Sequence, residues 1–522
     1  MVGVNITELG ESAAKNTFWL SMGLTLSTAI SAVAMILMAR LLGPAGYGIY
    51  SAATAPIYVI SLFRDWGVNT AVTRYTAHHR FDASKKATYL KAAITFELAS
   101  GGLISLIVIT FSKQIAVYVL KKPEIAFLIT IASIIVLPSG LRAVANGFLL
   151  GIERADIISE LLVAFSIFRN SLALTLIILG WGPFGALIGQ VVGFALNGIV
   201  AFTIAILIAK PRGRVLEPLK ELLSYGLPYA VVLIMTGLSM QLYNLVAARI
   251  LDYNEYGAFV AALNVFSTIL AILNTITAGF LPSFSRISKE EIAQVFEKAV
   301  KYIAFLIAPL IAILIATAQP LMIIVFGKEY HKAGTYFMLM AVTYITSIFG
   351  IQIINSTLLG LAETKQITKI WIPALGMGIL TLTLTTENLE AYSLILAIII
   401  TYLMATGIGL LIVKKYRATI SIRPLLKILV TVLMAVFGGT LSHISLNLYI
   451  NLVFSLTITT IIYTAMLVIL KPLNFKELEE LKIYVKNVPI IGGYFHKILD
   501  IYLKLVFHTK FTNSKSGNRI KI

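Results

Sequence analysis

The sequence predicts an all-α polytopic membrane protein of about 14 transmembrane helices, with two pseudo-symmetric six-helix bundles plus two extra helices. Hydrophobic residues make up 58% of the 522 residues and charged residues only 13%, too few to cover soluble domains of this size. Apolar segments long enough to cross a bilayer follow one another from about residue 17 to residue 470. An internal duplication with an offset of 209 residues is the third observation behind this fold class.

The duplication is clearest near the start of each half. Residues 39–53 (ARLLGPAGYGIYSAA) and 248–262 (ARILDYNEYGAFVAA) share seven of fifteen positions. Residues 145–151 and 354–360 keep the same offset and share an asparagine and a Leu-Leu-Gly sequence. An interval of this length is far longer than a solenoid repeat and is typical of a transporter built from two homologous halves.

Fourteen predicted spans account for the apolar segments. They lie at about 17–41, 48–73, 88–111, 125–150, 157–180, 183–209, 225–250, 256–282, 299–318, 334–360, 367–386, 390–413, 424–446 and 448–470. The duplicated unit holds six spans, so both halves enter the membrane in the same direction and are expected to be related by an axis along the membrane normal. The chain therefore divides into an N-terminal lobe (1–209), a C-terminal lobe (210–418), helices 13 and 14 (419–471) and a basic amphipathic cytoplasmic tail (472–522).

The distribution of basic residues predicts the orientation. With the N-terminus inside, 32 of the 42 Lys and Arg residues fall in cytoplasmic segments, 7 in outer segments and 3 within spans. Cytoplasmic loops of membrane proteins carry such an excess. We therefore expect a multi-pass protein of the cell (plasma) membrane with cytoplasmic N- and C-termini. The net charge of +18 then indicates this bias and not a nucleic-acid partner.

The tail contains two amphipathic segments, at about 474–486 and 494–507. Apolar side chains of the first segment keep helical spacing: Phe475, Leu478, Leu481 and Val485. This pattern predicts helices that lie on the anionic inner leaflet, with docking on a partner as the alternative.

The sequence lacks the residues of several kinds of chemistry. Without cysteine there are no disulfides, thiol nucleophiles or thiolate metal sites. Neither GxxxxGK[ST] nor HExxH occurs, and the outer segments are too short for a substrate-binding domain. We therefore predict a protein that is not an enzyme and uses no cofactor and no metal, and whose surroundings are membrane lipids.

Polar side chains inside the spans are costly and usually face a bundle interior. Span two carries six of them at intervals of three or four residues: Thr54, Tyr58, Ser61, Asp65, Asn69 and Thr73. On one helix they would form a single stripe, which we interpret as the wall of a water-lined cavity, with helix packing as the alternative.

Three arginines within spans have no basic counterpart in the second half. Arg64, Arg142 and Arg169 align, at the offset of 209, with Leu273, Ile351 and Gly378. An unpaired guanidinium in hydrocarbon is too costly to keep, so each must face water, a carboxylate or a ligand. We predict that the three line one substrate-binding cavity together with Asp65 and Asn69.

Internal pairing of these arginines is the alternative to a ligand-facing role. The candidate carboxylates are Asp65, Glu97 and Glu160. Features present in both halves, such as Arg40 and Arg249, are expected instead to serve the fold.

The motifs of the first two spans support a family resemblance. They are Arg40-Leu41-Leu42-Gly43-Pro44, Tyr47-Gly48-Ile49-Tyr50, and Asp65-Trp66-Gly67 followed by Arg74. In these motifs and in its number of spans the chain resembles the polysaccharide transporter family, which includes O-antigen flippases. That family lies within the multidrug/oligosaccharidyl-lipid/polysaccharide (MOP) flippase superfamily.

The resemblance implies a flippase that exports a polyprenyl-(di)phosphate-linked oligosaccharide by alternating access, for surface polysaccharide or glycan biosynthesis, and it raises glycan-assembly enzymes as candidate partners. Arginines fit a diphosphate because a guanidinium offers two parallel hydrogen bonds to phosphate oxygens. Many relatives carry an acidic residue in span seven, where this chain has Gln241 and Asn244. Ion coupling, if present, would therefore use Asp65 or Glu97.

Two other functions stay open. A cation-coupled multidrug exporter of the same superfamily would favour acidic groups in its site. A membrane enzyme of glycan assembly would form or cleave a bond in its substrate.

Overall fold

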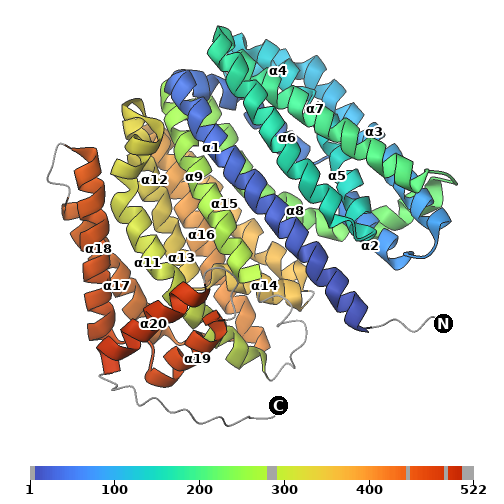
Figure 1. Ribbon diagram of the computed structural model, residues 1–522. Coiled ribbons are helices and arrows are strands. Elements are labelled where there is room, and N and C mark those ends of the chain that lie inside the picture. The colour runs from blue at the N-terminus through green and yellow to red at the C-terminus, as the bar shows by residue number, and fades with distance from the viewer. Residues whose placement is uncertain (1–5, 279–290, 362, 443–446, 487–491, 508–522) are drawn as a thin grey trace. The chain divides into compact units, whose positions relative to one another are not determined.

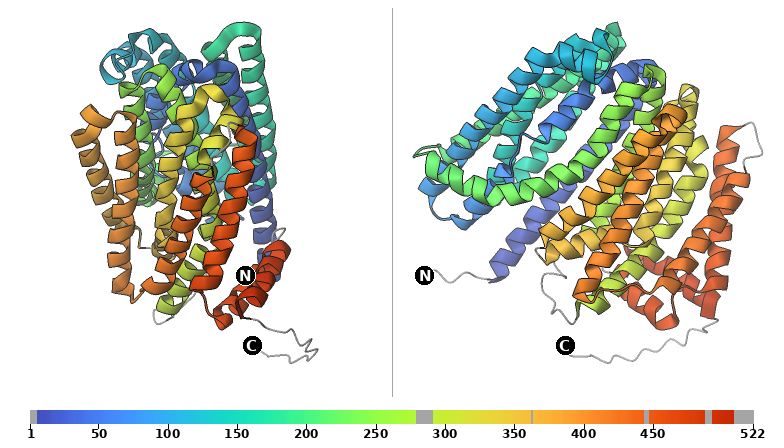
Figure 2. Two further views of the ribbon diagram at one scale, coloured as in Figure 1. Left: turned by 90° about the vertical axis from the view of Figure 1, so that its left-hand side faces the viewer. Right: turned by 180° about the vertical axis from the view of Figure 1, so that it is seen from behind.

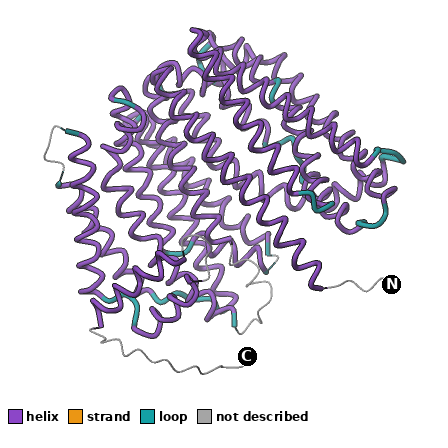
Figure 3. Tube along the Cα trace, in the orientation of Figure 1, coloured by secondary structure: helices purple, strands orange, loops and turns teal. Residues whose placement is uncertain are grey.

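The structure is a computed structural model that describes residues 6–278, 291–361, 363–442, 447–486 and 492–507. Every element in these ranges is helical (Figure 3). The α-helices are α1 (Ile6–Ser61), α2 (Val68–His78), α3 (Ala83–Gln114), α4 (Ala126–Ser133), α5 (Val136–Gly151), α6 (Ala155–Leu176), α7 (Gly182–Ala209), α8 (Leu216–Ile250), α9 (Tyr253–Ala278), α11 (Ile292–Phe326), α12 (His331–Ala341), α13 (Ile345–Ile348), α14 (Ile351–Gly360), α15 (Thr364–Leu389), α16 (Ala391–Val413), α17 (Ile422–Leu441), α18 (Leu448–Leu470), α19 (Phe475–Lys486) and α20 (Gly492–Phe507).

In the part of the chain that the structure describes, every predicted span falls largely on helices, and some spans are interrupted by short breaks. Within the described residues, ten helices are long and apolar enough to cross a membrane, or eleven if a bent pair, Lys328–Ile348 with Ile351–Gly360, is one span. Ala155–Ala209 contains two predicted spans, Lys15–Ser61 contains the first span and the first part of the second, and α8 holds the seventh. The chain is therefore an all-α, multi-pass membrane protein, as predicted.

A sharp bend divides α1 into two predicted spans. As one straight helix its 56 residues would extend about 84 Å, far beyond a hydrocarbon core of about 30 Å. The helix instead bends at Gly43, whose φ of 64° and ψ of 172° lie outside the helical region, and Pro44 follows. A positive φ costs glycine nothing because it has no Cβ, so the Gly-Pro pair sets the turn between spans one and two.

The second predicted span, at 48–73, is broken in a way that the sequence did not predict. Helix α1 ends at Ser61 and α2 begins at Val68, after Gly67 with a φ of 78°. The prediction of one continuous polar stripe from Thr54 to Thr73 is therefore wrong. Thr54 lies on α1, whereas Asn69 and Thr73 lie on α2.

Packing divides the chain into two compact units. Unit 1 comprises Met1–Ile269, Leu321–Met340 and Ala362–Ala405, and unit 2 comprises Leu270–Pro320, Ala341–Leu361 and Thr406–Ile522. The predicted lobes 1–209 and 210–418 follow the sequence duplication and not this packing, so they stay a prediction.

In unit 1, α1 packs against α6 and α7, and α5 packs against α2, α3 and α7 (Figure 1). Fully buried apolar side chains fill the space among these helices, including Val72, Leu90, Val144, Phe148 and Ala201. This apolar core holds α5, α6 and α7 in place, and these helices carry Arg142, Arg169 and Gln190, which are considered below.

In unit 2, the tail helices α19 and α20 lie side by side, as two further views also show (Figure 2). The prediction that α19 lies with its apolar face on the inner leaflet is wrong. Its Leu478 and Leu481 are buried in protein, and its Glu477 binds Lys301 of α11 at 2.7 Å. Residues 475–486 hold three Lys and three Glu, so α19 has no net attraction to an anionic surface, while its carboxylates find lysines on α11. Residues 508–522 of the predicted tail lie outside the described residues.

Candidate functional site

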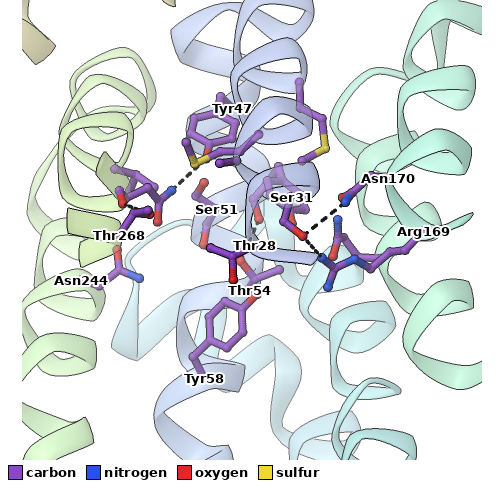
Figure 4. A pocket seen from close by; sticks show the side chains of 17 residues that line it. Thr28, Ser31, Tyr47, Ser51, Thr54, Tyr58, Arg169, Asn170, Asn244 and Thr268 are labelled. Atoms are coloured by element: carbon purple, nitrogen blue, oxygen red, sulfur yellow. Dashed lines mark hydrogen bonds between the residues drawn. The ribbon is translucent and has the colours of Figure 1, made fainter. Parts of the chain in front are cut away.

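Two neighbouring cavities lie within unit 1, among α1, α5, α6, α7, α8 and α9. The first, called here the arginine cavity, has a volume of about 210 Å³ and is lined by Ser27, Ser31, Arg142, Leu162, Phe165, Ser166, Arg169, Gly193, Phe194 and Asn197. The second, called here the tyrosine cavity, has a volume of about 280 Å³ and is lined by Thr28, Ser31, Ala32, Met35, Met38, Tyr47, Tyr50, Ser51, Thr54, Tyr58, Arg169, Asn170, Gln190, Asn244, Val260, Asn264 and Thr268 (Figure 4). Ser31 and Arg169 line both, so the two cavities are continuous at these residues.

The arginine cavity brings together two of the three predicted arginines. Arg169 on α6 donates from Nη2 to Ser31 Oγ on α1 at 3.1 Å, and its guanidinium carbon lies 5.0 Å from the ring centre of Phe194 on α7. The Nε atoms of Arg142 and Arg169 have no hydrogen-bond partner among the described residues. Neither guanidinium forms an ion pair with a carboxylate in that part of the chain. Two adjacent, uncompensated cations favour an anion in this cavity.

The third arginine has a different environment. Arg64 lies in the break between α1 and α2 and is buried. Its Nε is 2.8 Å from Glu97 Oε1 on α3, and its Nη1 donates to Ser139 Oγ at 2.7 Å. Arg64 lines neither cavity, and Glu97 is fully buried. The interaction is internal pairing, the alternative left open for these arginines.

Asp65 and Asn69 form a local pair. The Asn69 side-chain nitrogen donates to Asp65 Oδ2 at 2.7 Å, and the Asn69 backbone N–H donates to Oδ1 at 3.2 Å. This arrangement caps the start of α2, because a carboxylate there accepts backbone N–H groups that lack a helical partner. Neither side chain lines the arginine cavity or the tyrosine cavity. The roles predicted for Asp65, Asn69 and Glu97 in substrate binding or ion coupling stay predictions.

The tyrosine cavity is polar but almost uncharged. Twelve of its seventeen lining residues carry a hydroxyl or amide group, and Arg169 is the only charged residue among the seventeen. The sequence analysis missed most of these residues, although a signal was present. Gln190 and Asn197 are the only amide side chains in the apolar α7, seven residues apart and thus on one face. Both line a cavity.

Comparison with known proteins identifies the family. The model of the family described as polysaccharide biosynthesis protein matches residues 37–335, more than half of the chain. The chain belongs to this family. Among its relatives, the succinoglycan biosynthesis transport protein ExoT of Rhizobium meliloti (strain 1021) is 22% identical over 351 residues. The match covers 64% of the chain and 66% of ExoT, so it spans just under two thirds of that relative's length.

Solved structures share the fold at low sequence identity. The lipid II flippase MurJ in an inward closed conformation is similar with a TM-score of 0.70 and 16% identity, over 86% of the chain and 98% of MurJ. A multidrug resistance MATE family transporter of the MOP superfamily, facing inward, is similar with a TM-score of 0.61 and 16% identity, over 76% of the chain and 97% of the transporter. These similarities confirm the predicted fold class.

Proposed function

We propose that the protein is a flippase that moves a polyprenyl-(di)phosphate-linked oligosaccharide across the cell membrane by alternating access, for surface polysaccharide or glycan biosynthesis. The observation that carries the proposal is the arginine cavity, where Arg142 and Arg169 lie together without a carboxylate partner among the described residues. Family membership and the names of ExoT and MurJ, a transport protein and a flippase, support a transporter and not an enzyme.

The cavity chemistry supports an anionic head group. Two guanidiniums can bind a diphosphate through paired hydrogen bonds, and the neighbouring Asn197, whose buried Oδ1 lacks a partner among the described residues, adds an amide. The acyl chain can stay in lipid while the polar head crosses the protein. Moving two negative charges outward across an inside-negative membrane is favourable by about 4–5 kcal/mol per 100 mV. The membrane potential can therefore drive export in the absence of ATP.

The proposed setting follows from the charge distribution and the duplication. Lobes 1–209 and 210–418 would move relative to each other in the cell membrane, with both termini in the cytoplasm, because 32 of the 42 basic residues then lie inside. Glycan-assembly enzymes that make the lipid-linked substrate are the proposed partners. The predicted sites Asp65 and Glu97 would serve ion coupling if transport depends on an ion gradient.

The first test removes the two cavity cations. We expect Arg142→Ala with Arg169→Ala to lower translocation of a polyprenyl-diphosphate oligosaccharide in proteoliposomes at least tenfold, because a diphosphate would lose both bidentate partners. The two Arg→Lys changes should retain part of the activity, since lysine keeps the charge but loses the fork. Arg212→Ala, at an exposed linker position, is the control. Full translocation by a folded double Ala variant would overturn the proposal.

A multidrug exporter is the second candidate, because a MATE family transporter shares the fold. Cationic drugs favour carboxylates in a site, whereas the residues that line the two cavities include no Asp or Glu. Deletion of the gene should change surface glycans and leave drug susceptibility unchanged. The opposite result would favour the multidrug exporter.

A further inference from the structure

The tyrosine cavity has the composition of a site for a neutral, hydroxyl-rich ligand. Hydroxyl and amide groups predominate on its wall, and the rings of Tyr47 and Tyr50, with centres 6.1 Å apart, add apolar faces. A pyranose presents the same mixture of hydroxyls and apolar C–H faces. Specific sites for small ligands combine apolar walls with a few well-placed polar groups in this way.

Several polar groups on the wall have no protein partner. The hydroxyls of Tyr50 and Tyr58 and the amide of Gln190 form no hydrogen bond with another described residue. Gln190 is only 5% exposed and lines the cavity, and a polar group in such a place favours a hydrogen-bonding partner. These groups therefore favour a ligand, or water, that can both donate and accept hydrogen bonds.

Other groups are held in fixed orientations by neighbours. Tyr47 Oη accepts from Asn264 Nδ2 at 2.9 Å, as the dashed line in Figure 4 shows. The Tyr256 hydroxyl donates to Asn244 Oδ1 at 3.0 Å, which fixes the amide of Asn244 at the cavity wall. Such second-layer contacts pre-organise a site and lower the entropy lost on binding.

From these contacts we infer that the tyrosine cavity binds the sugar attached directly to the diphosphate, and that this sugar is uncharged. The inference rests on the proposed flippase function, in which the diphosphate occupies the arginine cavity. Ser31 and Arg169 line both cavities, so a diphosphate at Arg169 presents its first sugar to the tyrosine cavity. The volume of about 280 Å³ suits a compact ligand of one or two rings.

The charge of the wall determines the preference for a neutral sugar. A uronate would place a carboxylate among neutral groups, and Arg169, the one cation on the wall, would already be engaged by the diphosphate. An amino sugar would bring an ammonium group close to Arg169 with no carboxylate on the wall to compensate it. A buried charge without a partner is strongly disfavoured, so both charged sugars should bind worse than a neutral one.

The first experiment measures how tightly four lipid probes, which differ in their sugar and its charge, bind to the purified full-length protein. The probes are polyprenyl diphosphate alone and the same lipid carrying glucose, glucuronate or glucosamine. We expect the glucose form to bind at least tenfold more tightly than the two charged forms, and more tightly than the sugar-free lipid. Equal binding of all three sugars, or tighter binding of a charged sugar, would overturn the inference while leaving the flippase proposal intact. If no probe binds, including the sugar-free lipid, the flippase proposal itself fails.

The second experiment removes the unpartnered polar groups. Tyr58→Phe with Gln190→Met should abolish the advantage of the glucose form over the sugar-free lipid, while binding of the sugar-free lipid stays unchanged. Tyr449→Phe, which removes an exposed hydroxyl on α18, is the control. Unchanged sugar binding by the double variant would contradict the assignment. If the double variant also loses binding of the sugar-free lipid, it damages the diphosphate site. Tyr58→Phe alone is then the test: it should weaken binding of the glucose form and leave binding of the sugar-free lipid unchanged, and any other result contradicts the assignment.

Discussion

The same residue type has two different roles within the apolar part of this chain. Arg142 and Arg169 line a cavity without carboxylate partners in the described residues, whereas Arg64 pairs with Glu97 at 2.8 Å. Burying a charge is tolerated only with a partner or a polar ligand, so the surroundings and not the residue type decide the role. Arg64 was predicted to line the cavity. It lies instead in the break at residues 62–67, where its side chain contacts Glu97 of α3.

A double-mutant cycle tests whether the Arg64–Glu97 pair is structural. Glu97→Leu alone leaves a buried guanidinium without its carboxylate and should destabilise the protein by about 3–5 kcal/mol, whereas Arg64→Met with Glu97→Leu should recover most of this loss. Arg64→Met alone completes the cycle. Thermal unfolding in detergent measures the stability of each variant, and proteoliposome translocation measures activity. Additive losses in the cycle would contradict the pairing. A stable double variant that no longer transports would support the coupling role predicted for Glu97.

Part of the site could be predicted from the sequence. The rest depends on contacts between residues that are far apart in the chain. Arginines in apolar segments are rare and costly, so Arg142 and Arg169 could be singled out without a structure. The pairing of Arg64 could not be predicted, because Glu97 lies 33 positions away on another helix. The uncharged wall was also missed, since single hydroxyl and amide residues are common in membrane helices and only their convergence from five helices marks a site.

At the scale of elements, hydropathy located the apolar helices of the described residues but not the breaks within them. The break before α2 depends on tertiary contact, because the backbone of Gly67 approaches that of Gly226 on α8 so closely that a Cβ at Gly67 would lie 2.1 Å from the Gly226 carbonyl oxygen. For the tail helices α19 and α20, too, the sequence pattern does not determine what they contact. An amphipathic pattern is the same for a helix on lipid and a helix on protein, and only the partner distinguishes them.

The contact of α19 with α11 should depend on charge and on pH. Lys298 Nζ and the Tyr302 hydroxyl donate to Glu480 Oε2 at 2.7 and 2.9 Å, and these hydrogen bonds lower the pKa of Glu480 below its ordinary value of 4.5. A lowered pKa favours the docked carboxylate above pH 4.5, and this contribution is lost as the pH falls through the lower, docked-state value. Amide hydrogen exchange of α19 in the full-length protein should therefore be slow at neutral pH and faster in acid.

Swapping the charges of Lys298 and Glu480 provides the control for this contact. Lys298→Glu should speed amide hydrogen exchange in α19 at neutral pH. Lys298→Glu with Glu480→Lys should slow this hydrogen exchange again in part. Exchange that is equally slow in the single variant would show that the buried Leu478 and Leu481 hold the helix without help from the ion pair.

At the scale of the whole molecule, the residues shared by both halves join one half to the other. All of these contacts lie within unit 1. Arg40 donates to the carbonyl oxygens of Ile324 and Val325, the latter at 2.7 Å, at the end of α11. Its counterpart Arg249 donates to the carbonyl oxygens of Tyr118 and Val119, each at 2.8 Å, just after α3. Each arginine thus caps a helix of the opposite half, where unpaired carbonyls and the negative end of the helix dipole attract a cation.

The duplicated Tyr-Gly pairs meet at the same place. A Cβ at Gly48 would lie 2.0 Å from the Tyr253 carbonyl oxygen, and a Cβ at Gly257 would lie 1.9 Å from the Pro44 carbonyl oxygen. The two backbones can approach this closely because neither glycine carries a side chain. The reciprocal contacts agree with the expectation that features common to both halves serve the fold, and they join the two sequence halves near the bend of α1.

Alternating access requires these contacts to separate when the protein opens near this bend. Hydrogen bonds to a charged donor contribute about 1.5–3 kcal/mol each, so Arg40→Ala with Arg249→Ala should shift the equilibrium toward the open state by at least about tenfold. The chain has no cysteine, so a single Ser51→Cys change in the tyrosine cavity gives an unambiguous reporter. We expect a membrane-impermeant thiol reagent added outside to label Ser51→Cys much faster in the double variant, while the Arg212→Ala control labels at the slow rate of the parent. Faster labelling only from the cytoplasmic side would reverse the proposed orientation, and unchanged labelling from both sides would show that the reciprocal arginines stabilise the fold without controlling access.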